Sequence, residues 1–169
     1  MDRKIAFIAA SVGSAFLAAA CGSYGTSAYG STSTGGSPGA ATPSAGASGP
    51  SSIATRSTAL GQVLVDGNGR TLYLFEADKG SASSCYDACA GVWPPLTTMG
   101  APIAGAGVNQ SQLATTTRKD GSTEVVYNGH PLYYFISDKQ AGDTTGQGLS
   151  SFGADWYVLS AAGTKIDES

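Results

Sequence analysis

The sequence predicts a mostly β domain of antiparallel hairpins, or a meander, made from two fused repeats with one or two short helices. Internal similarity is the first observation: a segment that begins at Asn68 recurs at Asn128 with a constant offset of 60. Both copies place β-rich runs around a turn that contains Asn-Gly, a strong hairpin signal. The third observation is that, apart from residues 2–4, no charged residue precedes Arg56. Because a folded surface needs charge, we expect one globular domain at residues 56–169.

The two copies align without a gap over twelve positions. They are residues 68–79 and 128–139, which read NGRTLYLFEADK and NGHPLYYFISDK. Further along the chain, Trp93 corresponds to Trp156 after an insertion of three residues. These matches place the two repeats at about 58–96 and 113–160.

Strands are expected where β-branched and aromatic residues lie next to turn residues. In the first copy, strands 62–66 and 71–75 flank the turn Gly67-Asn68-Gly69. The second copy predicts a hairpin that starts at 113–118 and turns at Asp120-Gly121, a strand at 123–127, the turn Asn128-Gly129 and a strand at 131–135. Segments 93–96 and 156–159 are expected as late strands, which gives an antiparallel meander of four or five strands.

Helix is expected in two short segments only. Residues 83–91 predict a short helix with Ser83 or Ser84 as its N-cap and Gly91 as its end. Residues 109–113 predict a single turn.

The central strand of each copy is apolar on both faces. Alternation places Leu72 and Leu74 on one face, with Tyr73 and Phe75 on the other. In the preferred interpretation, the local core covers one face and the sister repeat covers the other. The alternative is an exposed aromatic platform that binds a glycan or a peptide.

Residues 1–20 have the features of a cleavable secretory signal. A charged start precedes sixteen apolar or small residues, 5–20, which at about 1.5 Å per residue are too short for a hydrocarbon core of about 30 Å. The end of this stretch and the two residues after it, 17–22, read LAAACG and resemble the lipobox of bacterial lipoproteins. That resemblance implies that Cys21 carries fatty acyl chains, such as palmitate, and becomes the N-terminus of the mature chain.

Residues 21–55 predict a lipidated cysteine followed by a disordered tether, because Gly, Ser, Ala, Thr and Pro bury too little apolar surface to fold. The protein is therefore expected outside the cytoplasm, on the outer face of the cell membrane, or on the outer membrane if the organism has two membranes. The formal net charge is −3, and no cluster of Lys or Arg is present. Nucleic acid is not an expected partner, since it requires clustered cations.

A motif within the repeat indicates a family. Tyr73, Phe75 and Asp78 form a Tyr-x-Phe-x-x-Asp motif that returns as Tyr133, Phe135 and Asp138. With Cys85-x-x-x-Cys89 and Trp93-Pro94-Pro95, this set resembles the bacterial predicted lipoproteins built from a secreted repeat. The resemblance covers nearly all of residues 59–163. It implies lipoprotein export and a repeat fold, and it implies no activity.

Cys85 and Cys89 are the only thiols that remain after lipidation of Cys21. In an exported protein two nearby cysteines favour a disulfide, and a spacing of four on a helix brings the Cα atoms to about 6 Å. The alternative is copper or another redox role, with His130, the single histidine, as a third soft ligand. A third possibility is that both thiols are free.

Asp78 and Asp138 occupy equivalent positions in the two copies. An Asp at the end of a strand ordinarily accepts hydrogen bonds from backbone N–H groups of a turn. The alternative is that each carboxylate helps to bind calcium or a ligand hydroxyl.

The sequence contains no recognisable catalytic constellation. We therefore expect a lipid-anchored cell-envelope protein, non-enzymatic, that acts as a binding or structural module without a cofactor. Its expected partners are the membrane, through the lipid, and an unidentified envelope ligand or protein. The alternative function is a copper-binding or redox protein that uses Cys85, Cys89 and His130.

Overall fold

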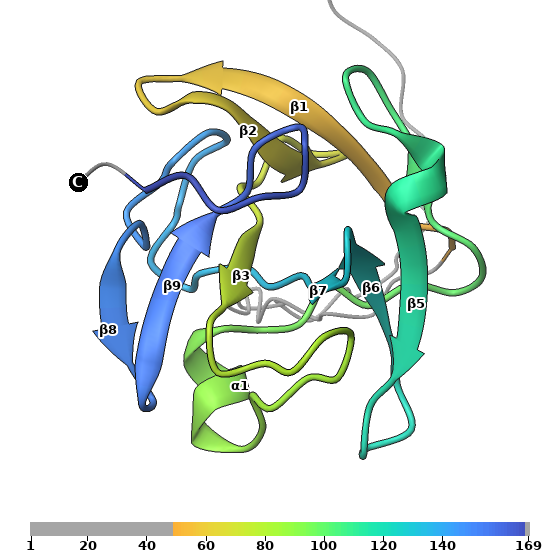
Figure 1. Ribbon diagram of the computed structural model, residues 1–169, viewed down its shortest axis with the longest axis vertical. Helices are drawn as coiled ribbons and strands as arrows, with labels where there is room; N and C mark the ends of the chain where they lie inside the picture. The colour runs from red at the N-terminus through yellow and green to blue at the C-terminus, as the bar shows by residue number, and fades with distance from the viewer. Residues whose placement is uncertain (1–48, 168–169) are drawn as a thin grey trace, which may run out of the picture. The chain divides into compact units, whose positions relative to one another are not determined.

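The computed structural model describes residues 49–167 as a mostly β domain (Figure 1). The predicted signal peptide, Cys21 and most of the predicted tether lie outside these residues. Three three-stranded sheets make up the domain, so the mostly β prediction is confirmed, but the single meander is not found. Within residues 49–167, no helix is long and apolar enough to cross a membrane.

The first sheet has the order β2-β1-β4. Its strands are β1 (Ser52–Thr58), β2 (Gly61–Asp66) and β4 (Ile103–Ala104). The last four residues of the predicted tether, 52–55, therefore belong to β1, and the prediction placed the start of the domain too late. The absence of charge before Arg56 was a wrong guide to the start of the domain. Ile53, inside that uncharged stretch, is fully buried and provides the apolar surface that a strand needs. The β1–β4 pair is parallel, which a purely antiparallel meander does not contain.

The second sheet joins the two repeats. It has the order β3-β9-β8, with β3 at Tyr73–Phe75, β8 at Leu149–Ser151 and β9 at Ala154–Val158. The predicted first hairpin forms only partly: the Leu72 N–H binds the Leu64 carbonyl at 3.0 Å, and the chain then turns to pair with β9. The expected late strand around Trp156 is present as β9.

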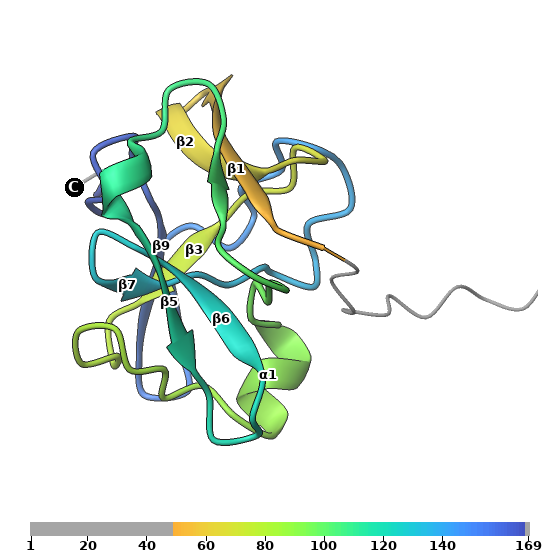
Figure 2. The same cartoon turned by 90° about the vertical axis from the view of Figure 1, so that its right-hand side faces the viewer.

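The third sheet, β5-β6-β7, keeps the predicted hairpins (Figure 2). Its strands are β5 (Leu113–Thr117), β6 (Thr123–Tyr127) and β7 (His130–Pro131). Asn128 and Gly129 have φ angles of 49° and 84°, as a tight hairpin turn requires. The expected strand 131–135 is shortened to β7, because Tyr133 forms isolated bridges with Tyr73 and Pro95 instead. Of the expected strand 93–96, only Pro95 forms a bridge, which pairs it with Tyr133.

The helical prediction was right in one place and misplaced in the other. The short α1 covers Ala88–Val92 rather than 83–91, and neither Ser83 nor Ser84 caps it, since residue Asp87 precedes the helix. The turn predicted at 109–113 is a 3-10 helix, η1 (Gln110–Gln112), in which the Asn109 side chain accepts a hydrogen bond from the Ser111 N–H.

Two buried clusters fill the domain, one on each side of β3. Tyr73 and Phe75 lie in an aromatic cluster, whereas Leu72 and Leu74 lie in a second, largely aliphatic cluster. All four are at most 3% exposed, so the packing interpretation is confirmed and the exposed platform is wrong. β3, which separates the two clusters, lies near the middle of the domain in both Figure 1 and Figure 2.

Candidate functional site

The equivalent tyrosines of the two repeats meet at the centre of the domain. The Tyr73 N–H donates to the Tyr133 carbonyl at 2.9 Å, and the Tyr133 N–H donates to the Tyr73 carbonyl at 3.0 Å. A reciprocal pair of bonds between equivalent residues is the relation that a two-fold axis produces. The two repeats therefore associate as two subunits of a symmetric dimer would.

The side chains repeat this exchange. The Tyr73 hydroxyl donates to Asp138 Oδ2 at 2.7 Å, and the Tyr133 hydroxyl donates to Asp78 Oδ2 at 2.8 Å. The tyrosine of each motif thus binds the aspartate of the other motif. The offset of 60 shows that the two motifs are equivalent, but it does not by itself predict this exchange.

The second oxygen of each aspartate binds a turn in its own repeat. Asp78 Oδ1 accepts from both the N–H and the hydroxyl of Ser84, each at 2.7 Å. Asp138 Oδ1 accepts from the N–H of Thr145 at 3.0 Å and also from its hydroxyl. The turn-binding prediction is confirmed, and both oxygens of each carboxylate are occupied by protein donors.

Both tyrosines are held as hydrogen-bond donors. Burial, together with the neighbouring carboxylate of Asp138, raises the pKa of Tyr73 far above its ordinary value. Burial also raises the pKa of Tyr133, with further contributions from Glu124 and Asp78. The two hydroxyls therefore stay protonated throughout the physiological pH range.

Four aromatic rings form a continuous stack across the repeat boundary. The order is Phe75, Trp156, Trp93, Phe135, with successive centroids 4.1, 4.0 and 4.3 Å apart. Each tryptophan is thus covered by the phenylalanine of the other repeat. Edge-on contacts of Tyr73 with Trp93 and of Tyr133 with Trp156 close the cluster at 5.3 and 5.2 Å.

A buried ion pair breaks the symmetry on one side. Arg118 Nη1 lies 2.9 Å from Glu124 Oε2, and the two side chains are 1% and 0% exposed. The same guanidinium donates to Ser83 Oγ and to the Cys85 carbonyl, each at 2.6 Å. Since Ser83 also bonds the Tyr133 hydroxyl at 2.7 Å, the ion pair is connected to the Tyr133–Asp78 pair.

Burial shifts the pKa values of the two carboxyl groups in this network. Burial raises the pKa of Glu124 to about 7, although the Arg118 guanidinium acts in the opposite direction. Burial also raises the pKa of Asp78. This network was not predicted from the sequence, and the one signal for it is Glu124, a charged residue at the position where the first repeat has Leu64.

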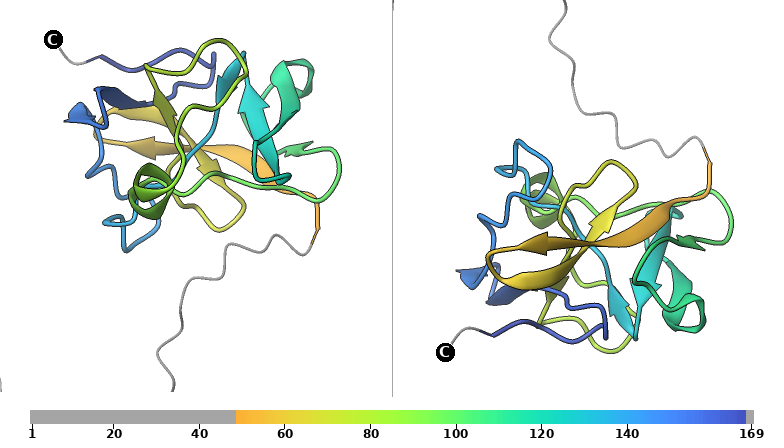
Figure 3. Two further views of the ribbon diagram at one scale, coloured as in Figure 1. Left: turned by 90° about the horizontal axis from the view of Figure 1, so that it is seen from below. Right: turned by 90° about the horizontal axis from the view of Figure 1, so that it is seen from above.

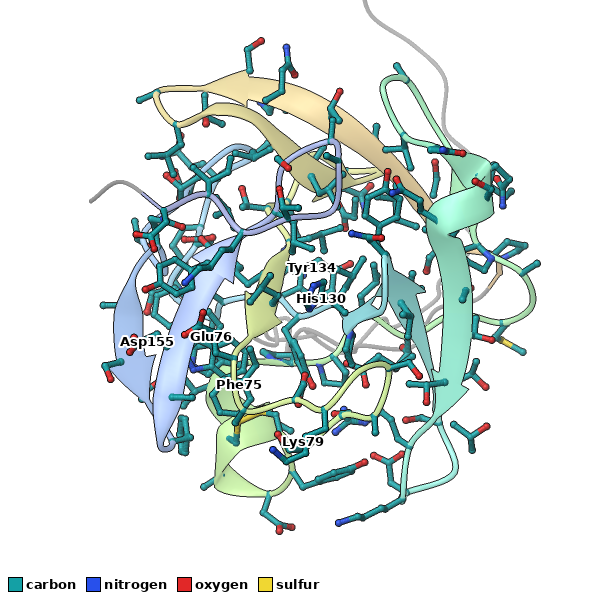
Figure 4. The ribbon with its side chains drawn as sticks, viewed as in Figure 1. Phe75, Glu76, Lys79, His130, Tyr134 and Asp155 are labelled. Atoms are coloured by element: carbon teal, nitrogen blue, oxygen red, sulfur yellow. A yellow bond between two sulfur atoms is a disulfide. The ribbon has the colours of Figure 1, made fainter. Side chains whose placement is uncertain are left out.

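Cys85 and Cys89 form a disulfide with Cα atoms 5.2 Å apart. Both cysteines are buried, at 0% and 7% exposure, in the aromatic cluster. His130 begins β7, whereas the disulfide includes Cys89 of α1, and Figure 4 shows His130 well away from α1. Within residues 49–167, no group of three His, Cys, Asp or Glu side chains is placed to hold a metal ion, so Cys85, Cys89 and His130 are not brought together as a copper site.

Comparison with known families identifies both repeats. The model of a family described as a secreted repeat of unknown function matches residues 54–97 and again residues 114–160, together more than half of the chain. No curated protein and no solved structure matches the chain. The two matches coincide with the repeats that exchange the Tyr–Asp bonds.

Proposed function

The chain belongs to the family of the secreted repeat of unknown function, and from this premise we propose that it is a lipid-anchored cell-envelope protein that binds or supports rather than catalyses. The observation that carries the proposal is the reciprocal exchange between Tyr73–Asp138 and Tyr133–Asp78. It assigns the polar groups of the motif to assembly of the domain. The motif accordingly marks a module whose function lies on its surface.

The disulfide supports the exported location. A buried Cys85–Cys89 bond is expected to form and persist in an oxidising compartment outside the cytoplasm. Lipid attachment at Cys21 is supported by the small residues before this cysteine. Two or more acyl chains hold a protein on a membrane, whereas a single chain holds it only marginally.

The lipid anchor is tested by metabolic labelling of the full chain with radioactive palmitate in a bacterial host. Wild type is expected to incorporate label and to sediment with membranes, and Cys21→Ala is expected to lose both properties. Cys85→Ala/Cys89→Ala is the matched control, because it removes two cysteines and keeps Cys21. Retention of the label by Cys21→Ala would contradict the anchor.

The non-enzymatic part has its own test. Purified wild type is incubated with panels of ester, peptide, glycoside and phosphoester substrates, and no turnover above buffer is expected. Turnover that disappears on a single polar substitution, with an unchanged melting temperature, would show that the protein is an enzyme.

A further inference from the structure

The two most exposed large apolar side chains among residues 49–167 lie close together in the chain. Met99 is 64% exposed and Ile103 is 52% exposed. They belong to a set of exposed apolar residues, here called the entry surface, which consists of Met99, Gly100, Ala101, Ile103, Ala106 and Gly107. Single exposed apolar residues are ordinary, whereas exposed apolar residues that gather on one part of a surface mark contact sites.

The segment that forms the entry surface contains no charged residue. No Asp, Glu, Lys, Arg or His occurs between Asp87 and Arg118. A surface that docks onto an apolar phase must shed its water, and charged groups make that step costly. The segment is therefore suited to an apolar partner and unsuited to an ionic one.

The position of the entry surface in the fold indicates which partner it contacts. The Met99 N–H donates to the Gly49 carbonyl at 3.2 Å, and the Ile103 N–H donates to the Ser51 carbonyl at 2.9 Å. The entry surface is thus hydrogen-bonded to the point where the chain arrives from Cys21. Figure 3 shows the green segment that contains it next to the orange start of β1.

The segment between Cys21 and the domain limits how far the domain can lie from the lipid. Residues 22–48 separate Cys21 from Gly49, and even a fully extended chain of this length spans at most about 100 Å. Tethering makes docking an intramolecular event, so a contact too weak to hold a free protein is sufficient.

We infer that the entry surface rests on the lipid bilayer that holds the acyl chains of Cys21, so that the domain lies on the membrane in one orientation. This inference depends on the lipid anchor of the proposed function. Because the surface is uncharged, the contact does not require anionic lipids and is insensitive to salt.

The test uses the lipidated full chain in phosphatidylcholine vesicles. An environment-sensitive fluorophore is attached at Ala101→Cys on the entry surface or, as a control, at Ser150→Cys on β8, which lies at the opposite edge of Figure 1. The introduced cysteine is the only free thiol, because Cys85 and Cys89 are bonded to each other and the lipid occupies the sulfur of Cys21. Nitroxide-labelled phosphatidylcholine serves as the quencher.

Quenching is expected to be roughly threefold or more stronger at position 101 than at position 150, since a docked side chain enters the headgroup region. Met99→Asp/Ile103→Asp is expected to reduce the quenching at 101 to the level at 150. The matched variant Leu149→Asp/Phe152→Asp, which removes two other exposed apolar side chains, is expected to leave it unchanged.

Each other outcome overturns the inference in a recognisable way. Equal quenching at both positions, with vesicles that still carry the protein in flotation, refutes the docking and leaves the anchor intact. A fluorescence change that depends on protein density and not on the nitroxide lipid shows that a second copy covers the surface. Failure of the chain to float with vesicles removes the anchor and the docking together.

Discussion

Trp93 and Trp156 lie face to face with ring centroids 4.0 Å apart and planes inclined by 1°. One ring belongs to each repeat, and each is backed by a phenylalanine from the other repeat. Neither repeat can bury its tryptophan on both sides alone. The stack therefore makes the two repeats one cooperative unit, and changes that widen it are expected to destabilise the whole domain.

Gly146 borders this stack and leaves no room for a side chain. A Cβ atom at this position would lie 2.7 Å from Trp93 Cη2 and 3.0 Å from Tyr73 Cε1. Gly146→Ala is therefore expected to lower the free energy of unfolding by about 1–3 kcal/mol, measured by urea denaturation.

Gly91→Ala is the control for that substitution. Gly91 lies in α1, and a Cβ there meets nothing within 4 Å. The control is expected to be neutral or to stabilise the protein by up to about 1 kcal/mol through helix propensity. Equal effects of the two alanines would show that the stack tolerates displacement.

The Tyr–Asp exchange predicts that two equivalent substitutions lower the free energy of unfolding by similar amounts. Tyr73→Phe and Tyr133→Phe each remove a buried hydroxyl that donates to a carboxylate. Each is expected to cost about 1.5–3 kcal/mol, the range for hydrogen bonds to charged groups, in the same urea experiment. Tyr157→Phe, at a partly exposed ring, is expected to change stability by less than about 0.5 kcal/mol. A loss in only one of the two motif variants would mean that the exchange is not reciprocal in solution.

Local signals were sufficient to predict much of the fold. The Asn128-Gly129 and Asp120-Gly121 turns, the strand at 123–127 and the burial of both faces of 72–75 all follow from residues near one another in the chain. The offset of 60 also predicted that the two copies share an interior. These features depend on turn chemistry and alternation, which a sequence displays directly.

These local signals could not predict which distant strands pair. The pairing of β3 with β9 joins residues about 80 positions apart, and nothing local to Tyr73 or Trp156 specifies it. The strand β1 was missed because its Ser- and Thr-rich sequence has the composition of a tether, although it is the central strand of its sheet. Arg118 and Glu124 lie in one hairpin, but they were missed because the turn signal at Asp120-Gly121 does not indicate that both side chains are buried.

The Arg118–Glu124 pair predicts an asymmetric result in a double-mutant cycle. Arg118→Met leaves the Glu124 carboxylate buried without its cation, which is expected to cost about 3–5 kcal/mol. Arg118→Met/Glu124→Met removes both charges and is expected to recover most of that loss, because desolvation of the pair offsets most of its attraction. Equal destabilisation of the single and double variants would mean that the contacts of Arg118 with Ser83 and Cys85 dominate.

The same carboxyl group predicts how stability depends on pH. The pKa of Glu124 rises from 4.5 in an unfolded chain to about 7 in the folded domain. Between these values the folded state binds the proton and the unfolded state does not. This contribution is therefore fully present below pH 4.5 and is lost as the pH rises through about 7. The expected loss of unfolding free energy between pH 5 and pH 8 is on the order of 2 kcal/mol.

The other shifted groups do not cancel this trend. The raised pKa of Asp78 acts in the same direction, and the lowered pKa of Asp120 acts only below its ordinary value of 3.8. Glu124→Gln is accordingly expected to reduce the change of the urea midpoint with pH between pH 5 and pH 8. Glu76→Gln, the same change in a surface ion pair with Lys165, is expected to keep the wild-type slope. A Glu124→Gln protein that retains the slope would place the titrating proton on another group.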